Sequence, residues 1–215
     1  MRLNSVIFAD DSSSCDIADL CVLLKNYTMI LLQQYAISHD NVELNNSIYM
    51  SNFISKYDIS EKMSVVNNDS FMCFWYGHGK EGCFRMDNED IITEVDNSYI
   101  FSNALIYTFS CYNGKDLADV LLENGAKVFV GYIGPANCPY FCDEITNEIV
   151  MSFIVSFLEG KTINEAKEDL KDAYEQAIFN EDLDPIHRAL YQETRDNLVV
   201  KGDGNLCIDD IMIIS

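Results

Sequence analysis

The chain has 215 residues, about the length of one globular domain, and 48% of them are hydrophobic. This composition supports a sizeable core and excludes an intrinsically disordered chain. The formal net charge of −21, from 14 basic and 35 acidic side chains, argues against direct contact with the phosphate backbone of a nucleic acid.

Strand-like and helix-like segments alternate along the chain. Apolar residues at spacings of three and four indicate helices, and short apolar runs indicate strands. Runs that are apolar without interruption are typical of strands buried on both faces of a parallel sheet. We predict strands at residues 5–9, 48–50, 71–76, 104–109, 127–132 and 198–201, and helices at residues 17–31, 51–66, 117–122, 144–158, 162–179 and 185–195.

Local signals add detail to this pattern. Thr162 followed by Glu165 predicts a capping box at the start of a helix, and residues 82–86 predict a hairpin that turns at residues 87–90. The last strand is predicted to be either a terminal strand or an edge ribbon with residues 206–208. No repeat or linker interrupts the alternation, so we predict a single α/β domain over the whole chain, with a mostly parallel sheet flanked by helices.

Two of the predicted strands end in chemically reactive side chains, His78 and Cys111. Ligands of open α/β sheets bind at the carboxyl ends of the strands, and glycines beside both residues allow the backbone to turn sharply. A histidine can generate a cysteine thiolate, and the backbone N–H groups of Gly79 and Cys111 could hold an oxyanion if the two loops face each other. Residue type alone leaves a core cysteine and a loop histidine as an alternative.

Five segments of the chain resemble the caspase-like cysteine peptidase superfamily, which includes caspases, gingipains, clostripain, separase and CHAT domains. Residues 71–79, an apolar strand ending in Gly-His-Gly, are similar to the histidine loop of this superfamily, and residues 107–114 are similar to its nucleophile loop. Residues 117–131, 160–166 and 198–206 resemble the CHAT and gingipain branches most.

The resemblance implies a caspase-like three-layer sandwich and a cysteine endopeptidase that cleaves a protein substrate. It implies that Cys111 is the nucleophile, that His78 moves the protons, and that the N–H groups of Gly79 and Cys111 hold the oxyanion. It also suggests a bacterial signalling or defence pathway, antiviral defence included. The caspase Gln-Ala-Cys-x-Gly motif is absent, so specificity for aspartate is not implied, and Phe109 stands where clostripain-like enzymes have an acidic residue.

Asp10 and Asp11, directly after the first predicted strand, are the candidate substrate-binding residues. Several members of the superfamily build their specificity pocket near this position, and a carboxylate there would pair with an arginine or lysine of the substrate. The alternative is that both carboxylates cap the next helix. Asp143 and Glu144, beyond a later strand, are weaker candidates for the same role.

Two other functions remain open at this stage. The chain could be a catalytically inactive adaptor that has the fold and binds a partner without cleaving it. It could instead be a zinc-stabilised binding module that uses Cys138 and Cys142 with His78 and Cys83, although zinc sites usually have two closely spaced cysteine pairs. We predict neither a metal nor a cofactor.

The chain is predicted to be cytoplasmic. Its longest apolar run, residues 149–158, is about half of the roughly 20 residues that span a bilayer, and the apolar stretch near Met1 is too short for a signal peptide. We therefore expect no contact with a membrane, and we expect most of the eight cysteines to be buried thiols. The expected partners are a protein or peptide substrate and an activating or regulatory protein.

Overall fold

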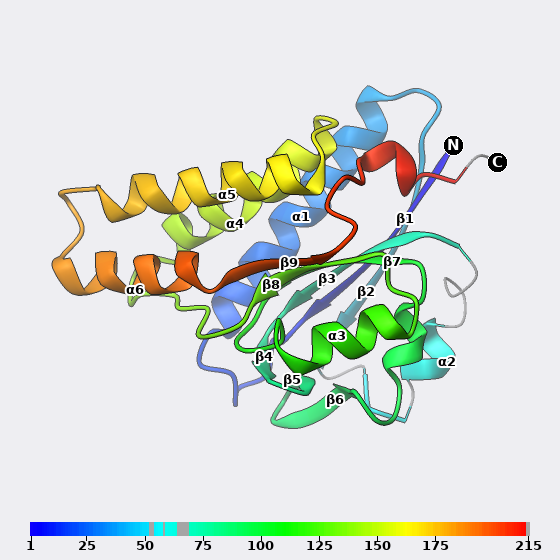
Figure 1. Cartoon of the computed structure of the whole chain (residues 1–215), viewed down its shortest axis with the longest axis horizontal. Helices are drawn as coiled ribbons and strands as arrows, with labels where there is room; N and C mark the ends of the chain where they lie inside the picture. The colour runs from blue at the N-terminus through cyan, green and yellow to red at the C-terminus, as the bar shows by residue number, and fades with distance from the viewer. Residues whose placement is uncertain (52–53, 58, 64–68, 214–215) are drawn as a thin grey trace.

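The computed structural model describes residues 1–51, 54–57, 59–63 and 69–213. A six-stranded sheet in the order β2-β1-β3-β7-β8-β9 lies at its centre (Figure 1). Neighbouring strands are parallel, except that β9 runs antiparallel to β8. The strands are β1 (Arg2–Ala9), β2 (Glu43–Met50), β3 (Phe71–Tyr76), β7 (Ala104–Phe109), β8 (Val128–Tyr132) and β9 (Leu198–Gly202).

Both faces of the sheet are buried, and β3 shows this most clearly. Met72, Phe74 and Tyr76 join one hydrophobic cluster, whereas the alternate residues Cys73 and Trp75 join a second cluster on the opposite face. Successive side chains of a strand point to opposite faces, so a strand buried on both sides needs an apolar residue at every position. Burial on both faces of the sheet therefore explains the uninterrupted apolar runs of the sequence.

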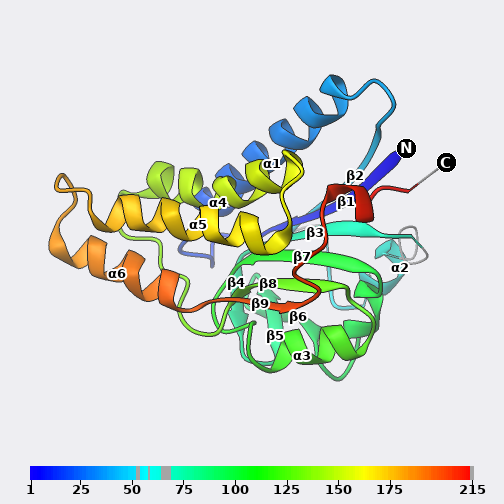
Figure 2. The same cartoon turned by 45° about the horizontal axis from the view of Figure 1, so that its top comes forward.

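Helices and a small second sheet form the two outer layers (Figures 1 and 2). The first face is covered by α1 (Ala18–Ser38), α4 (Asp143–Leu158), α5 (Ile163–Ile178) and α6 (Pro185–Asp196). The second face is covered by α2 (Ile59–Met63), α3 (Asp116–Glu123) and a three-stranded sheet made of β4 (His78–Lys80), β5 (Cys83–Met86) and β6 (Glu89–Thr93). The prediction of a mostly parallel α/β sandwich with helices on both faces is confirmed.

Two predicted local motifs are present. The Thr162 side chain accepts a hydrogen bond from the N–H of Glu165, and the Glu165 side chain accepts one from the N–H of Thr162, which completes the capping box. The β5–β6 hairpin turns at Asp87 and Asn88, whose φ angles of 47° and 63° are those of a tight turn. The sequence predicts this turn at residues 87–90, and it is shorter because β6 already begins at Glu89.

Other predictions need correction. Of the two predictions for the last strand, the terminal strand is confirmed, because β9 pairs with β8. The ribbon with residues 206–208 is wrong, because Ile208–Asp210 form a 3₁₀ turn. The strand predicted at 48–50 begins earlier, at Glu43. The sequence does not reveal its first residues because β2 is a partly exposed edge strand with many polar side chains. Of the helix predicted at 51–66, the structure shows α2, while residues 52–53, 58 and 64–66 of that range lie outside the described residues.

The strand order reverses at β1 and β3. The chain passes from β1 to β2 on one side of β1 and later enters β3 on its other side, and this kind of reversal marks the ligand-binding position of open α/β sheets. Ala9, Tyr76 and Phe109, the last residues of β1, β3 and β7, pair in register. The loops that follow these three strands therefore leave the sheet at one level. No helix in the described ranges has the length and apolar character needed to cross a bilayer.

Candidate active site

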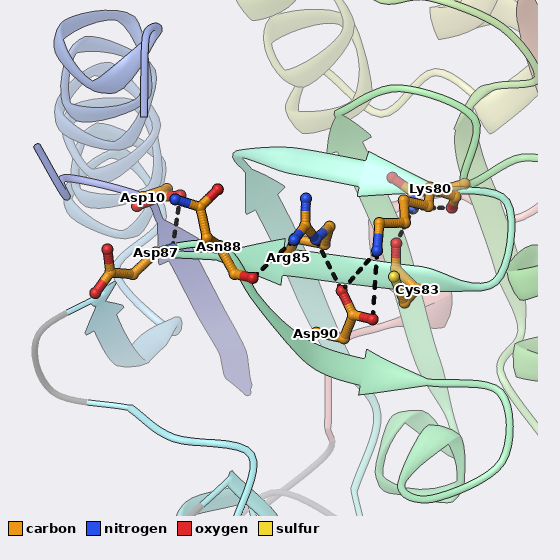
Figure 3. A network of polar contacts seen from close by, with 8 residues as sticks. Asp10, Lys80, Cys83, Arg85, Asp87, Asn88 and Asp90 are labelled. Atoms are coloured by element: carbon orange, nitrogen blue, oxygen red, sulfur yellow. Dashed lines mark hydrogen bonds and ion pairs between the residues drawn. The ribbon is translucent and has the colours of Figure 1, made fainter. Parts of the chain in front are cut away.

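His78 lies where the chain leaves the large sheet and enters the small one. It is the first residue of β4 and pairs with Arg85 of β5. The Arg85 Nε donates to Asp90 over 2.8 Å, and the Lys80 Nζ lies 3.2 Å from the same carboxylate (Figure 3). Although partial burial opposes the effect, hydrogen bonds from Arg85 and Lys80 hold the pKa of Asp90 below its usual range. This network ties together the three strands that carry the histidine.

Cys111 lies in the loop after β7 and is half-buried. Its Sγ accepts a hydrogen bond from the N–H of Ala136 over 3.3 Å, and burial raises the pKa of the thiol. The next residue, Tyr112, has a φ of 64°, a left-handed conformation that is uncommon for a bulky side chain. Its N–H donates to the carbonyl of Gly134 over 3.0 Å, so a hydrogen bond holds this strained turn in place.

Asn113 joins the loop of Cys111 to the hairpin of His78. Its Nδ2 donates to the carbonyl oxygens of Lys80 and Cys83 over 3.0 and 2.6 Å, and its Oδ1 accepts from the hydroxyl of Ser110. The side chain is fully buried. The two loops are therefore linked by hydrogen bonds on both sides of one amide.

Gly79 is in direct contact with the loop of Cys111. A Cβ atom added at Gly79 would lie 2.5 Å from the carbonyl oxygen of Cys111 and would also collide with the side chain of Asn113. Only a residue without a side chain permits this approach. The structure thus brings Gly79 and Cys111 together, and their role as oxyanion donors stays a prediction.

A group that the sequence analysis missed surrounds the His78 imidazole. The Nε2 of His78 lies 3.3 Å from a carboxylate oxygen of Asp16, and the thiol of Cys15 is a further neighbour. A hydrogen bond with Cys15 raises the pKa of His78 against the effect of burial, and the negative charge of Asp16 adds to the increase. Hydrogen bonds from Cys21 and His78 lower the pKa of Cys15 to about 6, against the effect of burial. The sequence signal that could have revealed Cys15 and Asp16 is their position, because both follow β1 at the edge of the sheet where β3 ends.

Asp10 and Asp11 lie at this edge, and both accept hydrogen bonds from the protein itself. Asp10 is fully buried, and its two oxygens accept from the N–H groups of Ser12 over 3.1 Å and Asp87 over 3.0 Å (Figure 3). Asp11 accepts from the N–H and the hydroxyl of Ser51. Neither carboxylate caps α1, because the N-cap residue of that helix is Ile17 and receives no side-chain hydrogen bond. Asp10 anchors the hairpin turn to the end of β1.

The residues of the alternative zinc site do not form a cluster. Within the described ranges, Cys15, Asp16 and His78 are the one group of metal-ligating side chains that lie close together. Cys138 contacts Asp143 over 3.3 Å, and Cys142 contacts His187 over 3.8 Å.

A hollow of about 450 Å³ lies beside the two loops. It is lined by residues of the β4–β5 turn and by Tyr112. The residues that line it are Gly79, Lys80, Glu81, Gly82 and Tyr112. The hollow therefore lies between the histidine hairpin and the residue after Cys111.

Comparisons with known proteins identify the fold. No protein-family model matches the chain, and no curated protein matches its sequence. Among solved structures, the Arg-specific cysteine proteinase gingipain R superposes with a TM-score of 0.63 at 14% identity, over 96% of this chain and 47% of that one. The complex of the Porphyromonas gingivalis RgpB pro- and mature domains gives 0.61 at 15% identity, over 95% of this chain and 48% of that one.

The chain spans about half the length of the solved structures that it matches. The chain therefore has the fold of the caspase-like cysteine peptidases.

Proposed function

We propose that the protein is a cysteine endopeptidase in which Cys111 and His78 form the catalytic dyad. One observation carries the proposal: on a caspase-like fold, the loops of His78 and Cys111 leave adjacent strands at one level and are joined through Gly79 and Asn113. This is the edge of the sheet where open α/β folds bind ligands.

The proposed reaction is acyl transfer. His78 takes the proton of the Cys111 thiol, and Sγ attacks the carbonyl carbon of the scissile bond to form a tetrahedral oxyanion. The N–H groups of Gly79 and Cys111 stabilise that charge. The intermediate collapses to a thioester as His78 gives its proton to the departing amine. A water molecule, deprotonated by His78, then hydrolyses the thioester and frees Cys111.

We propose that the structure represents a resting state of this site. The thiol of Cys111 is hydrogen-bonded to Ala136, and the imidazole of His78 is next to Cys15 and Asp16. Catalytic hydrogen bonds often tighten only when substrate binds, so we propose that the substrate, or an activating partner protein, brings the imidazole to the thiol.

We further propose that a basic residue precedes the cleaved bond. Three observations support this preference: the net charge of −21, the 84% exposed carboxylate of Asp16 beside His78, and the Arg specificity stated for gingipain R. Asp10 and Asp11 remain the predicted lining of the pocket, although Asp10 has both oxygens bound to backbone N–H groups.

The cellular setting is also a proposal. Eight unpaired cysteines fit a reducing compartment such as the cytoplasm. A role in bacterial signalling or antiviral defence, as in CHAT-type proteins, rests on the sequence resemblance alone.

An inactive adaptor is the second candidate, and one observation favours it. Burial raises the pKa of Cys111, so the resting thiol is not activated as a nucleophile. In such a protein the same surface would hold a peptide without cleaving it.

A peptide library cleaved by the purified full chain distinguishes the two candidates. The proposal expects cleavage that disappears in Cys111→Ala and in His78→Ala but persists in Cys138→Ala, a thiol in the loop after β8. A peptide with an electrophilic C-terminal group should modify Cys111, as located by mass spectrometry. Cleavage that survives Cys111→Ala, or modification of Cys15 in its place, would contradict the assignment of the nucleophile.

A further inference from the structure

Three different metal-ligating side chains meet beside the proposed active site. Cys15 and Asp16 come from the loop between β1 and α1, and His78 comes from the start of β4. One ligand atom from each residue lies within 4.8 Å of the other two, and Nε2 of His78 is 3.3 Å from the carboxylate of Asp16. Segments about sixty residues apart in sequence thus supply a thiol, a carboxylate and an imidazole to one point.

The distances between the ligand atoms suit a small ion with tetrahedral coordination. Zinc lies about 2.0–2.3 Å from nitrogen, oxygen and sulfur ligands, so the ligand atoms of a tetrahedral site are roughly 3.3–3.8 Å apart. The 3.3 Å between His78 and Asp16 already has this value, and 4.8 Å is the upper limit for the remaining pairs. A thiolate and an imidazole select zinc-class ions over calcium and magnesium, which prefer oxygen.

The loop that carries two of these ligands is held in place. The N–H of Cys15 donates to the carbonyl of Ser12 over 3.1 Å, and Asp10 accepts from the N–H of Ser12. Cys15 is only 7% exposed, while the side chain of Asp16 is 84% exposed. The thiol is therefore fixed at the bottom of the site, and the carboxylate leaves a route from solvent.

We propose that Cys15, Asp16 and His78 bind a divalent transition-metal ion of the zinc class. A thiolate, a carboxylate and a neutral imidazole balance the charge of such an ion, and three protein ligands leave a fourth position for water. With the ion bound to one ring nitrogen, the other nitrogen of the neutral imidazole carries a proton, so His78 cannot accept the proton of Cys111. The ion is therefore a reversible inhibitor, a consequence that rests on the proposed peptidase function.

Cobalt(II) binding to the full chain tests the site without any need for catalysis. The titration uses Cys111→Ala, which removes the thiol of the proposed dyad. We expect one equivalent of cobalt with visible bands of a tetrahedral complex and a near-ultraviolet thiolate-to-metal band. Cys15→Ser should abolish the thiolate band, and Asp16→Asn, an exposed change that leaves the core intact, should weaken affinity about tenfold or more.

Cys138→Ser is the matched control, because Cys138 also lies next to a carboxylate, that of Asp143, but its contacts include no histidine. It should leave the cobalt spectrum unchanged. The proposal is overturned if the thiolate band survives Cys15→Ser, if it is lost in Cys138→Ser, or if Asp16→Asn binds cobalt as tightly as the parent. Circular dichroism confirms that each variant is folded.

Inhibition is measured separately on the chain with Cys111 intact. Zinc should stop peptide cleavage, a chelator should restore it, and Asp16→Asn should require about tenfold more zinc or higher for the same inhibition. If no variant cleaves peptide, the proposed function fails while the cobalt result still decides the metal site. If cleavage occurs but cobalt binds without a thiolate band, the metal site fails and the peptidase stands.

Discussion

The side-chain amide of Asn113 lies 3.0 Å from the carbonyl oxygen of Lys80 and donates a hydrogen bond to it. Through this bond, the loop after β7 holds the hairpin that begins with His78. The same amide donates to Cys83, so both strands of the β4–β5 hairpin are fixed to one buried side chain. A buried residue that takes no part in the proposed chemistry therefore helps to fix the relative position of the two proposed catalytic loops.

Replacement of Asn113 by alanine should affect both folding and catalysis. Loss of the amide leaves buried carbonyl groups without a donor, which costs about 1–3 kcal/mol in the free energy of unfolding. The freed hairpin should also misplace His78, and kcat/KM should fall by about a hundredfold. Urea unfolding and peptide cleavage measure the two effects. Asn124→Ala, which removes an amide that donates to Val120 and Ser98 away from the site, should leave kcat/KM unchanged.

Gly79→Ala should be damaging, whereas Gly82→Ala on the same hairpin should be tolerated. A Cβ at Gly79 would meet the backbone of Cys111 and the buried Asn113, and such overpacking costs about 1–3 kcal/mol. A Cβ at Gly82 would meet only the flexible end of the Glu94 side chain. Thermal unfolding and cleavage rates measure the difference. Equal behaviour of the two variants would contradict the close approach seen in the structure.

The pH dependence of cleavage should reflect the surroundings of His78. The imidazole must be neutral to accept the thiol proton, so its raised pKa places the acidic limb of kcat/KM above the usual range for histidine. Cys15→Ala removes the hydrogen bond that contributes most to this increase, and the limb should move to lower pH. The profiles are measured with a chelator present, so that no metal contributes. Cys138→Ala should leave the limb in place, and a limb that stays or rises in Cys15→Ala would refute the expected contact.

The buried hydroxyl groups of Tyr132 and Tyr174 should contribute to the free energy of unfolding as a pair, not independently. They lie 2.8 Å apart and are hydrogen-bonded to each other, linking β8 to α5. Removal of one hydroxyl leaves the other without a partner, so each single change to phenylalanine should cost about 1–3 kcal/mol, while the double change should cost less than the two together. Urea unfolding of the four proteins measures the cycle, and additive costs would argue against the bond.

Asp10→Ala separates anchoring from substrate recognition. Because Asp10 binds the N–H groups of Ser12 and Asp87, its loss should lower the free energy of unfolding by about 1–3 kcal/mol. If Asp10 instead lines the specificity pocket, the main effect should be a lost preference for basic residues before the cleaved bond. Profiling of the library with Asp10→Ala and Asp11→Ala measures that preference, alongside thermal unfolding.

The sequence predicts the fold where burial forces a simple pattern. The central strands β3, β7 and β8 are buried on both faces, so their apolar runs are unmistakable. At the edges the pattern weakens: β2 is partly exposed, and β9 joins the sheet through an antiparallel pairing with β8 that its own residues do not indicate.

The residues of the candidate site also fall into those that the sequence reveals and those that it does not. His78 and Cys111 are found from sequence because each directly follows a recognisable strand. Cys15 and Asp16 are not, because their proximity to His78 depends on how the loop after β1 folds across the sheet. Asn113 is missed for a related reason: its role comes from two carbonyl groups about thirty residues earlier in the chain, and backbone acceptors have no signature in a sequence.

His78 and Cys111 are carried by different sheets, the first by the small sheet and the second by the end of β7. The small sheet rests on the large one partly through Phe84, whose ring stacks on Trp75 with 4.5 Å between ring centroids. Favourable ring pairs occur over about 4.5–7 Å, so a rigid-body displacement of the small sheet by about 1 Å would preserve this contact. The same displacement would change the rate of the proposed reaction about a hundredfold. Such a displacement requires the two hydrogen bonds from Asn113 to the β4–β5 hairpin to break, so the ring contact alone does not fix the small sheet, and these two bonds do.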